Sequence, residues 1–399
     1  MLDKIFWLIL IGMLAVYLSY FAAMFLLSRR KLKFKKEEIF PEVSLIIPTF
    51  NEARVILRKL NNICELKYPK EKLETILVDS ASKDETVSLA EKFLSERGKE
   101  FNMRLVSLKE RLGKASALNH VWQMCNGEIV VISDADCLLE SNSVSEVVKA
   151  FADSSVGVVT GSHVIVNPGK FAAKSVENNY RSIFSVLRQG ESYLDSTPIV
   201  NGQLCAYRKK LIENLNEDSV CDDIELAMRI RRKGYRIVFE PQAVFFEFTP
   251  RKFLARLKQK SRRAQGIIQQ LFRFSNMMFK KRYGSFAFLI FPFEFFFHIV
   301  SPVILAFLLF LLILNIFNPV FLTTISVLLL FFLALSGALL LIGRLKKNKL
   351  GSAMVPFTFL ESQLYLFLGL LPLLIGRTSH KWKIIDEVRE LNSETSLDS

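Results

Sequence analysis

The chain has 399 residues, 51% of them hydrophobic, and carries 53 Lys and Arg against 39 Asp and Glu, a formal net charge of +14. Its mean hydropathy is +0.28, which is unusual for a water-soluble protein with so much charge, so we expect apolar and charged residues in separate segments. The five cysteines are odd in number and scattered, and there are only four histidines. This composition argues against a disulfide framework and against a zinc site.

Three short segments hold the whole excess of positive charge. Residues 29–38 have a net charge of +4, residues 250–283 carry eleven basic residues and no acid, and residues 344–349 add +4. These segments total +19, which against +14 overall leaves −5 for the rest of the chain. Each segment adjoins a long apolar run, so the excess charge indicates contact with membrane lipids and not with nucleic acid.

Four apolar runs are candidates for membrane spans, each of which takes ~20 residues. The run at 5–27 is longer than the apolar core of a cleaved signal peptide, ~7–15 residues. It ends in three basic residues, which predicts an uncleaved anchor with the following residues in the cytoplasm. The other runs are 285–314, 320–341 and 354–375. The run at 285–314 exceeds one span, so part of it can also lie along the membrane interface.

Three ionisable residues lie within the C-terminal apolar runs: Glu294, His298 and Glu361. Ionisable groups at membrane depth tend to face a polar cavity or each other. Positions near the lipid headgroups, or in a packing contact between helices, explain them equally well.

Short apolar runs alternate with helical patterns between residues 42 and 249. The apolar runs are 43–47, 73–78, 103–108 and 128–133, and helical patterns follow the first three. This alternation predicts an α/β domain with a mainly parallel sheet. Ligands of such sheets bind beyond the carboxyl ends of the strands. Polar residues follow three of these runs in turn: Asn51, Glu52, Asp79, Asp84, Asp134 and Asp136.

Asp134 and Asp136 directly follow an apolar run and are the strongest candidates for metal ligands. An acid after a strand is often only a helix N-cap, and for Asp84 the stretch 82–85 favours a capping box. Two carboxylates at positions i and i+2, however, can both reach a hard divalent cation. Mg²⁺ and Mn²⁺ take such oxygens together with phosphate oxygens of a substrate, so the pair predicts a site for one of these ions.

Other candidates for chemistry lie at predicted helix starts. The chain has neither GxGxxG nor GxxxxGK[ST], which argues against a dinucleotide fold and a phosphate-cradling loop. Lys114 opens a helical pattern and can still contact a phosphate or a nucleotide. Asp222 and Asp223 also open a helix, where acids ordinarily compensate the helix dipole.

Residues 250–283 predict a basic amphipathic helix on an anionic membrane surface. Eleven cations without an acid would repel one another, which favours an anionic partner, either lipid or pyrophosphate, over plain solvent. The apolar residues recur at helical spacing: Phe253, Leu257, Ala264, Ile268 and Leu271.

Together the motifs resemble the membrane-integrated family 2 glycosyltransferases, the group of the cellulose, hyaluronan and poly-N-acetylglucosamine synthases and the lipid glucosyltransferases. The resemblance extends over residues 43–270. The quoted stretches are Ile47-Pro-Thr-Phe-Asn51-Glu52, Arg111-Leu-Gly-Lys-Ala-Ser-Ala-Leu-Asn119, Asp134-Ala-Asp136, Cys221-Asp222-Asp223 and Gln259-Lys-Ser-Arg262-Arg263.

The resemblance implies a GT-A-like nucleotide-sugar domain and assigns roles to its residues. Asp223 would be the catalytic base, and Asp136 with Asp134 would hold Mg²⁺ or Mn²⁺. The residues assigned to substrate binding are Pro48, Asn51, Glu52, Asp79, Lys114, Asp134, Gly202, Asp222, Gln259, Arg262 and Arg263. Arg263 replaces the tryptophan that helps to form the acceptor site of the processive synthases, and this favours a lipid or short glycan acceptor.

We therefore expect a membrane-bound, metal-dependent, inverting glycosyltransferase of the cell membrane with a cytoplasmic catalytic domain. It would move a sugar from a UDP- or GDP-sugar to a lipid or short glycan. The alternatives are a processive polysaccharide synthase coupled to export and a membrane transporter or scaffold with a nucleotide-sensing domain. The expected segments are an anchor (1–28), a basic linker (29–41), the catalytic domain (42–249), the amphipathic region (250–283), a bundle of about three spans (284–377) and a polar tail (378–399).

Overall fold

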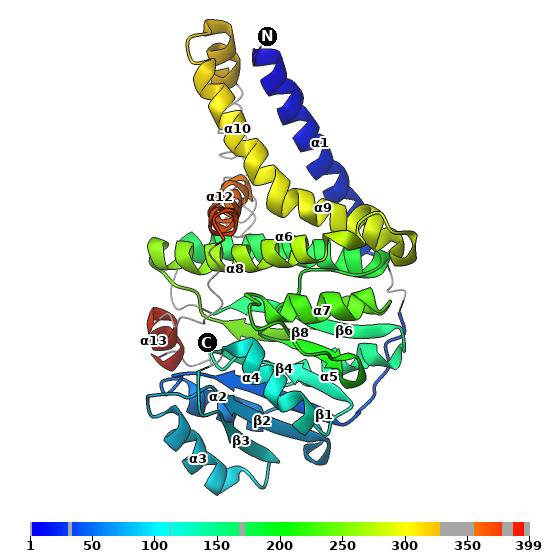
Figure 1. Ribbon diagram of the computed structural model, residues 1–399, viewed down its shortest axis with the longest axis vertical. Coiled ribbons are helices and arrows are strands. Elements are labelled where there is room, and N and C mark those ends of the chain that lie inside the picture. The colour runs from blue at the N-terminus through cyan, green and yellow to red at the C-terminus, as the bar shows by residue number, and fades with distance from the viewer. Residues whose placement is uncertain are drawn as a thin grey trace, which may run out of the picture.

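The computed structural model describes residues 2–30, 34–111, 113–166, 172–327, 355–376 and 386–394. It has three layers (Figure 1). An α/β domain forms one end, α6 (Ala172–Leu194) and α8 (Phe253–Arg273) cover it, and α1 (Leu2–Ser28) and α10 (Ser301–Leu314) project from the far side of these two helices.

The α/β domain is built on one sheet, which within the described residues has eight strands in the order β3-β2-β1-β4-β7-β6-β8-β5. Strands β1 to β4 pair in parallel, as the alternating pattern predicts. Strand β7 runs antiparallel to β4 and β6, and β5 runs antiparallel to β8. The strands are β1 (Val43–Thr49), β2 (Leu73–Asp79), β3 (Met103–Ser107), β4 (Ile129–Ile132), β5 (Cys137–Leu139), β6 (Val156–Ile165), β7 (Cys205–Arg208) and β8 (Arg236–Glu247).

The sheet is therefore mixed. Parallel pairing, as predicted, joins β1 to β4 and also joins β6 to β8, whereas β7 and β5 run antiparallel to their neighbours. Apolar runs reveal buried strands but not their direction, because a strand buried on both faces reads the same either way.

Two apolar cores lie on opposite faces of the sheet. Successive residues of a strand point to opposite faces, so in β1 Ile46 packs into one core while Leu45 and Ile47 pack into the other. Further α-helices among the described residues are α2 (Ile56–Cys64), α3 (Thr86–Arg97), α4 (Lys114–Val121), α5 (Ser143–Lys149), α7 (Asp222–Arg232), α9 (Phe291–Phe295), α12 (Val355–Leu374) and α13 (Asp386–Glu394).

The amphipathic helix predicted within 250–283 is present as α8, with Ala264, Ile268 and Leu271 buried. Acidic residues of the chain itself neutralise some of the cations of this helix. Arg256 pairs with Glu361 at 3.1 Å, and Arg273 pairs with Glu225 at 2.9 Å. The segment therefore needs less charge from a lipid or pyrophosphate partner, because acids distant in sequence already neutralise part of its own charge.

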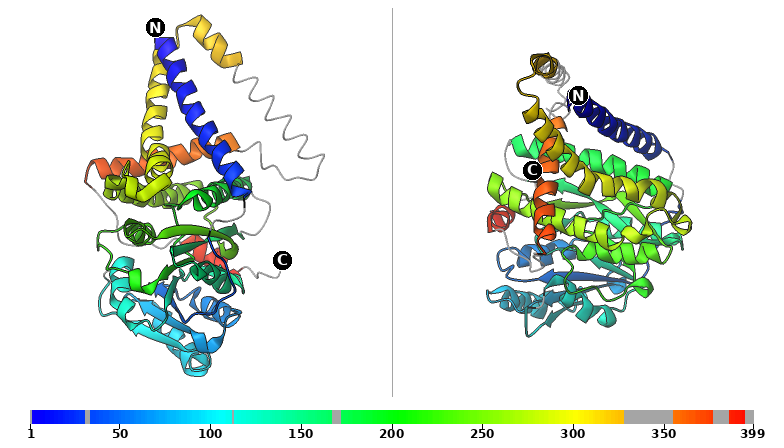
Figure 2. Two further views of the ribbon diagram at one scale, coloured as in Figure 1. Left: turned by 90° about the vertical axis from the view of Figure 1, so that its right-hand side faces the viewer. Right: turned by 45° about the horizontal axis from the view of Figure 1, so that its top comes forward.

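Two helices among the described residues are long and apolar enough to cross a membrane, Leu2–Ser28 and Phe286–Leu314. The run predicted at 354–375 forms α12, which lies across the layer of α6 and α8 and crosswise to α1 and α10 (Figure 2). Most of the run at 320–341 lies outside the described residues. The number of spans and their orientation stay predictions.

The ionisable residues of these helices are paired. His298 Nδ1 lies 3.0 Å from Glu294 Oε2 in a buried contact, so these two side chains face each other. Glu361 points from α12 to Arg256 of α8, which places it at the helix layer. The pairing removes much of the support for a transport pathway built on these three groups.

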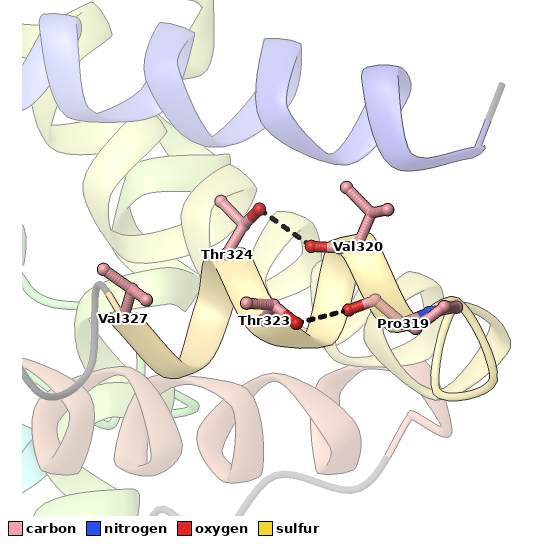
Figure 3. Close-up of a pocket in the computed structure, with 5 residues that line it drawn as sticks. All are labelled: Pro319, Val320, Thr323, Thr324 and Val327. Carbon is pink, nitrogen blue, oxygen red and sulfur yellow. Dashed lines mark hydrogen bonds between the residues drawn. The ribbon is translucent and has the colours of Figure 1, made fainter.

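A pocket on the helix at 319–327 lies beside these apolar helices (Figure 3). Thr323 and Thr324 donate their hydroxyl hydrogens to the carbonyls of Pro319 and Val320 in the same helix. None of the five lining residues, which include Val327, is charged, so this pocket offers no chemistry of its own.

Helix α6, which the sequence analysis did not anticipate, packs closely against α1 through Gly190. A Cβ atom at Gly190 would lie 2.4 Å from the carbonyl oxygen of Met24. We predict that Gly190→Ala lowers the stability of the detergent-solubilised protein by about 1–3 kcal/mol, because the helices must separate. Gly12→Ala is the control, since no heavy atom lies within 4 Å of its new Cβ. Equal melting temperatures for the two variants would contradict this packing.

Candidate active site

The turns after β1 and β2 are locked together at the carboxyl edge of the sheet. Asn51 adopts a left-handed conformation with φ of 52°. Its backbone N–H donates to Ser82 Oγ at 2.8 Å, and its Oδ1 accepts from the Lys83 N–H at 2.7 Å. Pro48 lies in β1 opposite Val78, so the predicted Pro48 and Asn51 both lie at this edge.

Asp79 ends β2 and is almost fully buried. Its carboxylate accepts from Ser82 Oγ at 2.5 Å and from the Ser82 N–H at 2.9 Å. The capping box expected at 82–85 does not form, because Ser82 is engaged by Asp79. Asp84 instead accepts from the N–H groups of Ala53 and Thr86 and ties the two turns together. These hydrogen bonds therefore hold the two turns together without a ligand.

Three of the predicted acids, Asp134, Asp222 and Asp223, lie around the Lys114 ammonium. Lys114 opens α4, and its Nζ lies 2.7 Å from Asp134 Oδ1 and 3.5 Å from Asp222 Oδ2. Burial by itself would lower the pKa of the Lys114 ammonium, but Asp134, Asp222 and Asp223 raise it above its usual range. Residues from three separate segments of the sequence therefore form one charged cluster.

Asp223 lies beside this cluster at the start of α7, facing Gly202. A Cβ atom at position 202 would come within 2.8 Å of Asp223 Oδ2, so glycine leaves room for the carboxylate. Burial raises the pKa of Asp223 to about 7, Asp222 adds to the rise, and Lys114 opposes it. A carboxylate with such a pKa is suited to accept a proton near neutral pH.

A buried lysine supports the turn that carries Asp134 and Asp136, and the sequence analysis missed it. Lys59 of α2 is fully buried, and its Nζ donates to Ser133 Oγ at 2.7 Å and to the Cys137 carbonyl at 2.9 Å. The signal was available, because Lys59 lies on the apolar face of α2 at helical spacing from Ile56.

Arg389 reaches the same site from the segment expected to be a polar tail. Its guanidinium binds Glu52 through two hydrogen bonds of 2.6 and 2.9 Å and lies 2.8 Å from Asp136 Oδ2. Burial raises the pKa of Glu52 to about 7, and Arg389 opposes the rise. Nothing in the spacing of residues 386–394 points to this contact.

Helix α8 brings its predicted residues to the same region. Burial lowers the pKa of Arg262, and the nearby Asp134 and Asp222 carboxylates oppose this shift. Arg263 points elsewhere and pairs with Glu247 at 2.6 Å. Gln259 is half-buried one turn before Arg262.

The chemistry of Asp134 and Asp136 fits a divalent cation. No group of three or more His, Cys, Asp or Glu side chains arranged to hold a metal occurs in the described part of the chain. Each of the two carboxylates does attract a cation of the chain, Lys114 and Arg389 respectively. Mg²⁺ and Mn²⁺ commonly bind through one or two carboxylates with substrate phosphates and water completing the shell.

Residues 44–215 match the family model described as glycosyl transferase family 2. The chain is 27% identical over 245 residues to the poly-beta-1,6-N-acetyl-D-glucosamine synthase of Staphylococcus aureus (strain COL), which covers 60% of this chain and 58% of that protein. It is 30% identical over 261 residues to the probable glycosyltransferase YdaM of Bacillus subtilis (strain 168), 64% of this chain and 62% of that one. The matches thus span less than two thirds of these relatives.

A solved structure is similar over nearly the whole chain. The mannosyltransferase PcManGT from Pyrobaculum calidifontis, in complex with GDP-Man and Mn²⁺, superposes with a TM-score of 0.75 and 28% identity. The superposition covers 94% of this chain and 99% of that one. The GT-A-like fold predicted from the motifs is confirmed by this similarity.

Proposed function

Because the chain carries a glycosyl transferase family 2 domain, we propose that it transfers a sugar from a nucleoside diphosphate sugar to an acceptor hydroxyl at the cytoplasmic face of a membrane. The observation that carries this proposal is the convergence of Asp134, Asp222 and Asp223 on Lys114 at the carboxyl edge of the sheet. A pure nucleotide sensor has no use for a buried base at Asp223.

The donor binds across this edge. Asp79, held between the turns of Asn51 and Ser82, receives the nucleobase, and Lys114 with Arg262 faces the diphosphate. A UDP- or GDP-sugar fits these roles, and the similar mannosyltransferase was solved with GDP-Man. A Mg²⁺ or Mn²⁺ ion held by Asp134 and Asp136 would neutralise the charge that develops on the leaving diphosphate.

Asp223 acts as the general base. It takes the proton of the acceptor hydroxyl while the acceptor oxygen forms its bond to the anomeric carbon and the bond from that carbon to the diphosphate oxygen breaks. One displacement on the face opposite the leaving group inverts the anomeric configuration. Gly202 leaves the space in which the carboxylate lies.

The proposed acceptor is a lipid or a short glycan. Arg263, which replaces the tryptophan of the processive synthases, is engaged by Glu247, and the apolar helices adjoin the layer formed by α6 and α8. A processive synthase is the second candidate, favoured by the name of the Staphylococcus aureus relative. The two candidates differ in the length of the product.

We predict that Asp223→Asn lowers the rate of sugar transfer at least 100-fold, because removal of a general base typically costs about 10²–10⁴ in rate. Transfer from labelled donor in membranes measures the rate, and thermal shift with the nucleoside diphosphate checks that donor binding is retained. Asp218→Asn is the matched control, since Asp218 is an exposed acid paired with Arg273. A near wild-type rate for Asp223→Asn would refute the assignment.

The pH dependence of the transfer should report the same group. Asp223 is protonated below its pKa and cannot then accept a proton, so kcat/KM should fall as the pH decreases through about 7. The measurement is the initial rate at low donor concentration from pH 5 to 9 with constant free Mn²⁺. An acid limb near the ordinary aspartate pKa of about 4 would contradict a buried base.

A further inference from the structure

The C-terminal helix α13 closes one side of the proposed metal site. Arg389 binds Glu52 through two hydrogen bonds and lies 2.8 Å from Asp136 Oδ2. The Nδ2 group of Asn392, one turn later, donates to the Asp136 carbonyl at 2.9 Å. The helix therefore contacts both the side chain and the backbone of the residue assigned to the metal.

Contacts on both sides of Arg389 keep α13 in place. Val388 and Leu391 pack with Phe248 in a small apolar cluster. The Arg251 N–H donates to Glu387 at 3.1 Å, and Arg58 donates to Asn392 Oδ1 at 2.7 Å. The position of Arg389 thus depends on docking of the whole helix and not on one flexible side chain.

The charges around Arg389 are almost completely removed from water. Its side chain is 6% exposed, and those of Glu52 and Asp136 are 0% and 15% exposed. Buried, charge-assisted hydrogen bonds of this kind are much stronger than surface ion pairs. The guanidinium offsets the repulsion between two carboxylates, which is the role that a metal ion would otherwise fill at Asp136.

We propose that Arg389 competes with the divalent cation for Asp136, so that α13 acts as a cationic strap across the donor site. The guanidinium lies against Asp136 Oδ2, and two positive charges on one carboxylate repel each other. In this proposal Arg389 moves off Asp136 when the cation binds, and the guanidinium thereby lowers the affinity of the site for free metal. The inference rests on the proposed function for the role of Asp136.

The test is a titration of the full-length protein in detergent with Mn²⁺ alone, followed by electron paramagnetic resonance of the free ion. Arg389→Gln should bind Mn²⁺ roughly tenfold more tightly than the wild type, because a hydrogen-bonded charge no longer occupies Asp136. Glu390→Gln is the control on the same helix, since Glu390 pairs with Arg54 at the surface, and its affinity should not change.

A second measurement uses the wild-type protein and does not depend on how the variant folds. Hydrogen exchange of residues 386–394 should accelerate when Mn²⁺ is added, because the strap loses one of its contacts. Unchanged exchange, or equal or weaker Mn²⁺ binding by Arg389→Gln, would overturn the competition without contradicting the metal role of Asp136. Absence of Mn²⁺ binding in both proteins would overturn the competition together with the metal role of Asp136.

Discussion

The structure depends on one constraint, the mutual repulsion of carboxylates gathered at the carboxyl edge of the sheet. Asp136 and Asp134 add to the rise that burial causes in the pKa of Glu52, and Asp222 and Asp134 add to the same rise in the pKa of Asp223. Lys114 contacts both Asp134 and Asp222, and Arg389 contacts both Glu52 and Asp136. Such a cluster is stable only if cations lie among the acids. The chain supplies Lys114 from α4, Arg262 from α8 and Arg389 from α13, so segments far apart in the sequence must meet here.

The helix α8 connects this edge to the apolar helices. Toward the sheet it presents Arg262 and Arg263, and toward α12 it presents Arg256. A displacement of α8 would therefore change contacts both at the edge of the sheet and at α12. For the proposed transfer, this arrangement would let an acceptor approach from the side of the apolar helices while the donor occupies the edge of the sheet.

The motifs of the sequence predicted much of this site, because each lies at the end of a strand or the start of a helix, where local pattern fixes position. The position of Asp134 after a strand indicated a metal ligand, whereas Asp222 and Asp223 were assigned to the site only through the family resemblance. The structure brings these acids together around Lys114. Lys59 was missed although it lies on the apolar face of α2, since a buried lysine violates the usual pattern. Arg389 was missed because its contacts lie more than 250 residues away, and no local pattern encodes them.

The most direct test of the proposed chemistry is the product released from the donor. Membranes containing the protein, supplied with Mn²⁺ and a labelled UDP- or GDP-sugar, should release nucleoside diphosphate as sugar is transferred. Release should stop on addition of EDTA and be lost in Asp136→Asn. Release of pyrophosphate, or nucleoside diphosphate release that persists without a divalent cation, would contradict a metal-assisted glycosyl transfer at this carboxylate cluster.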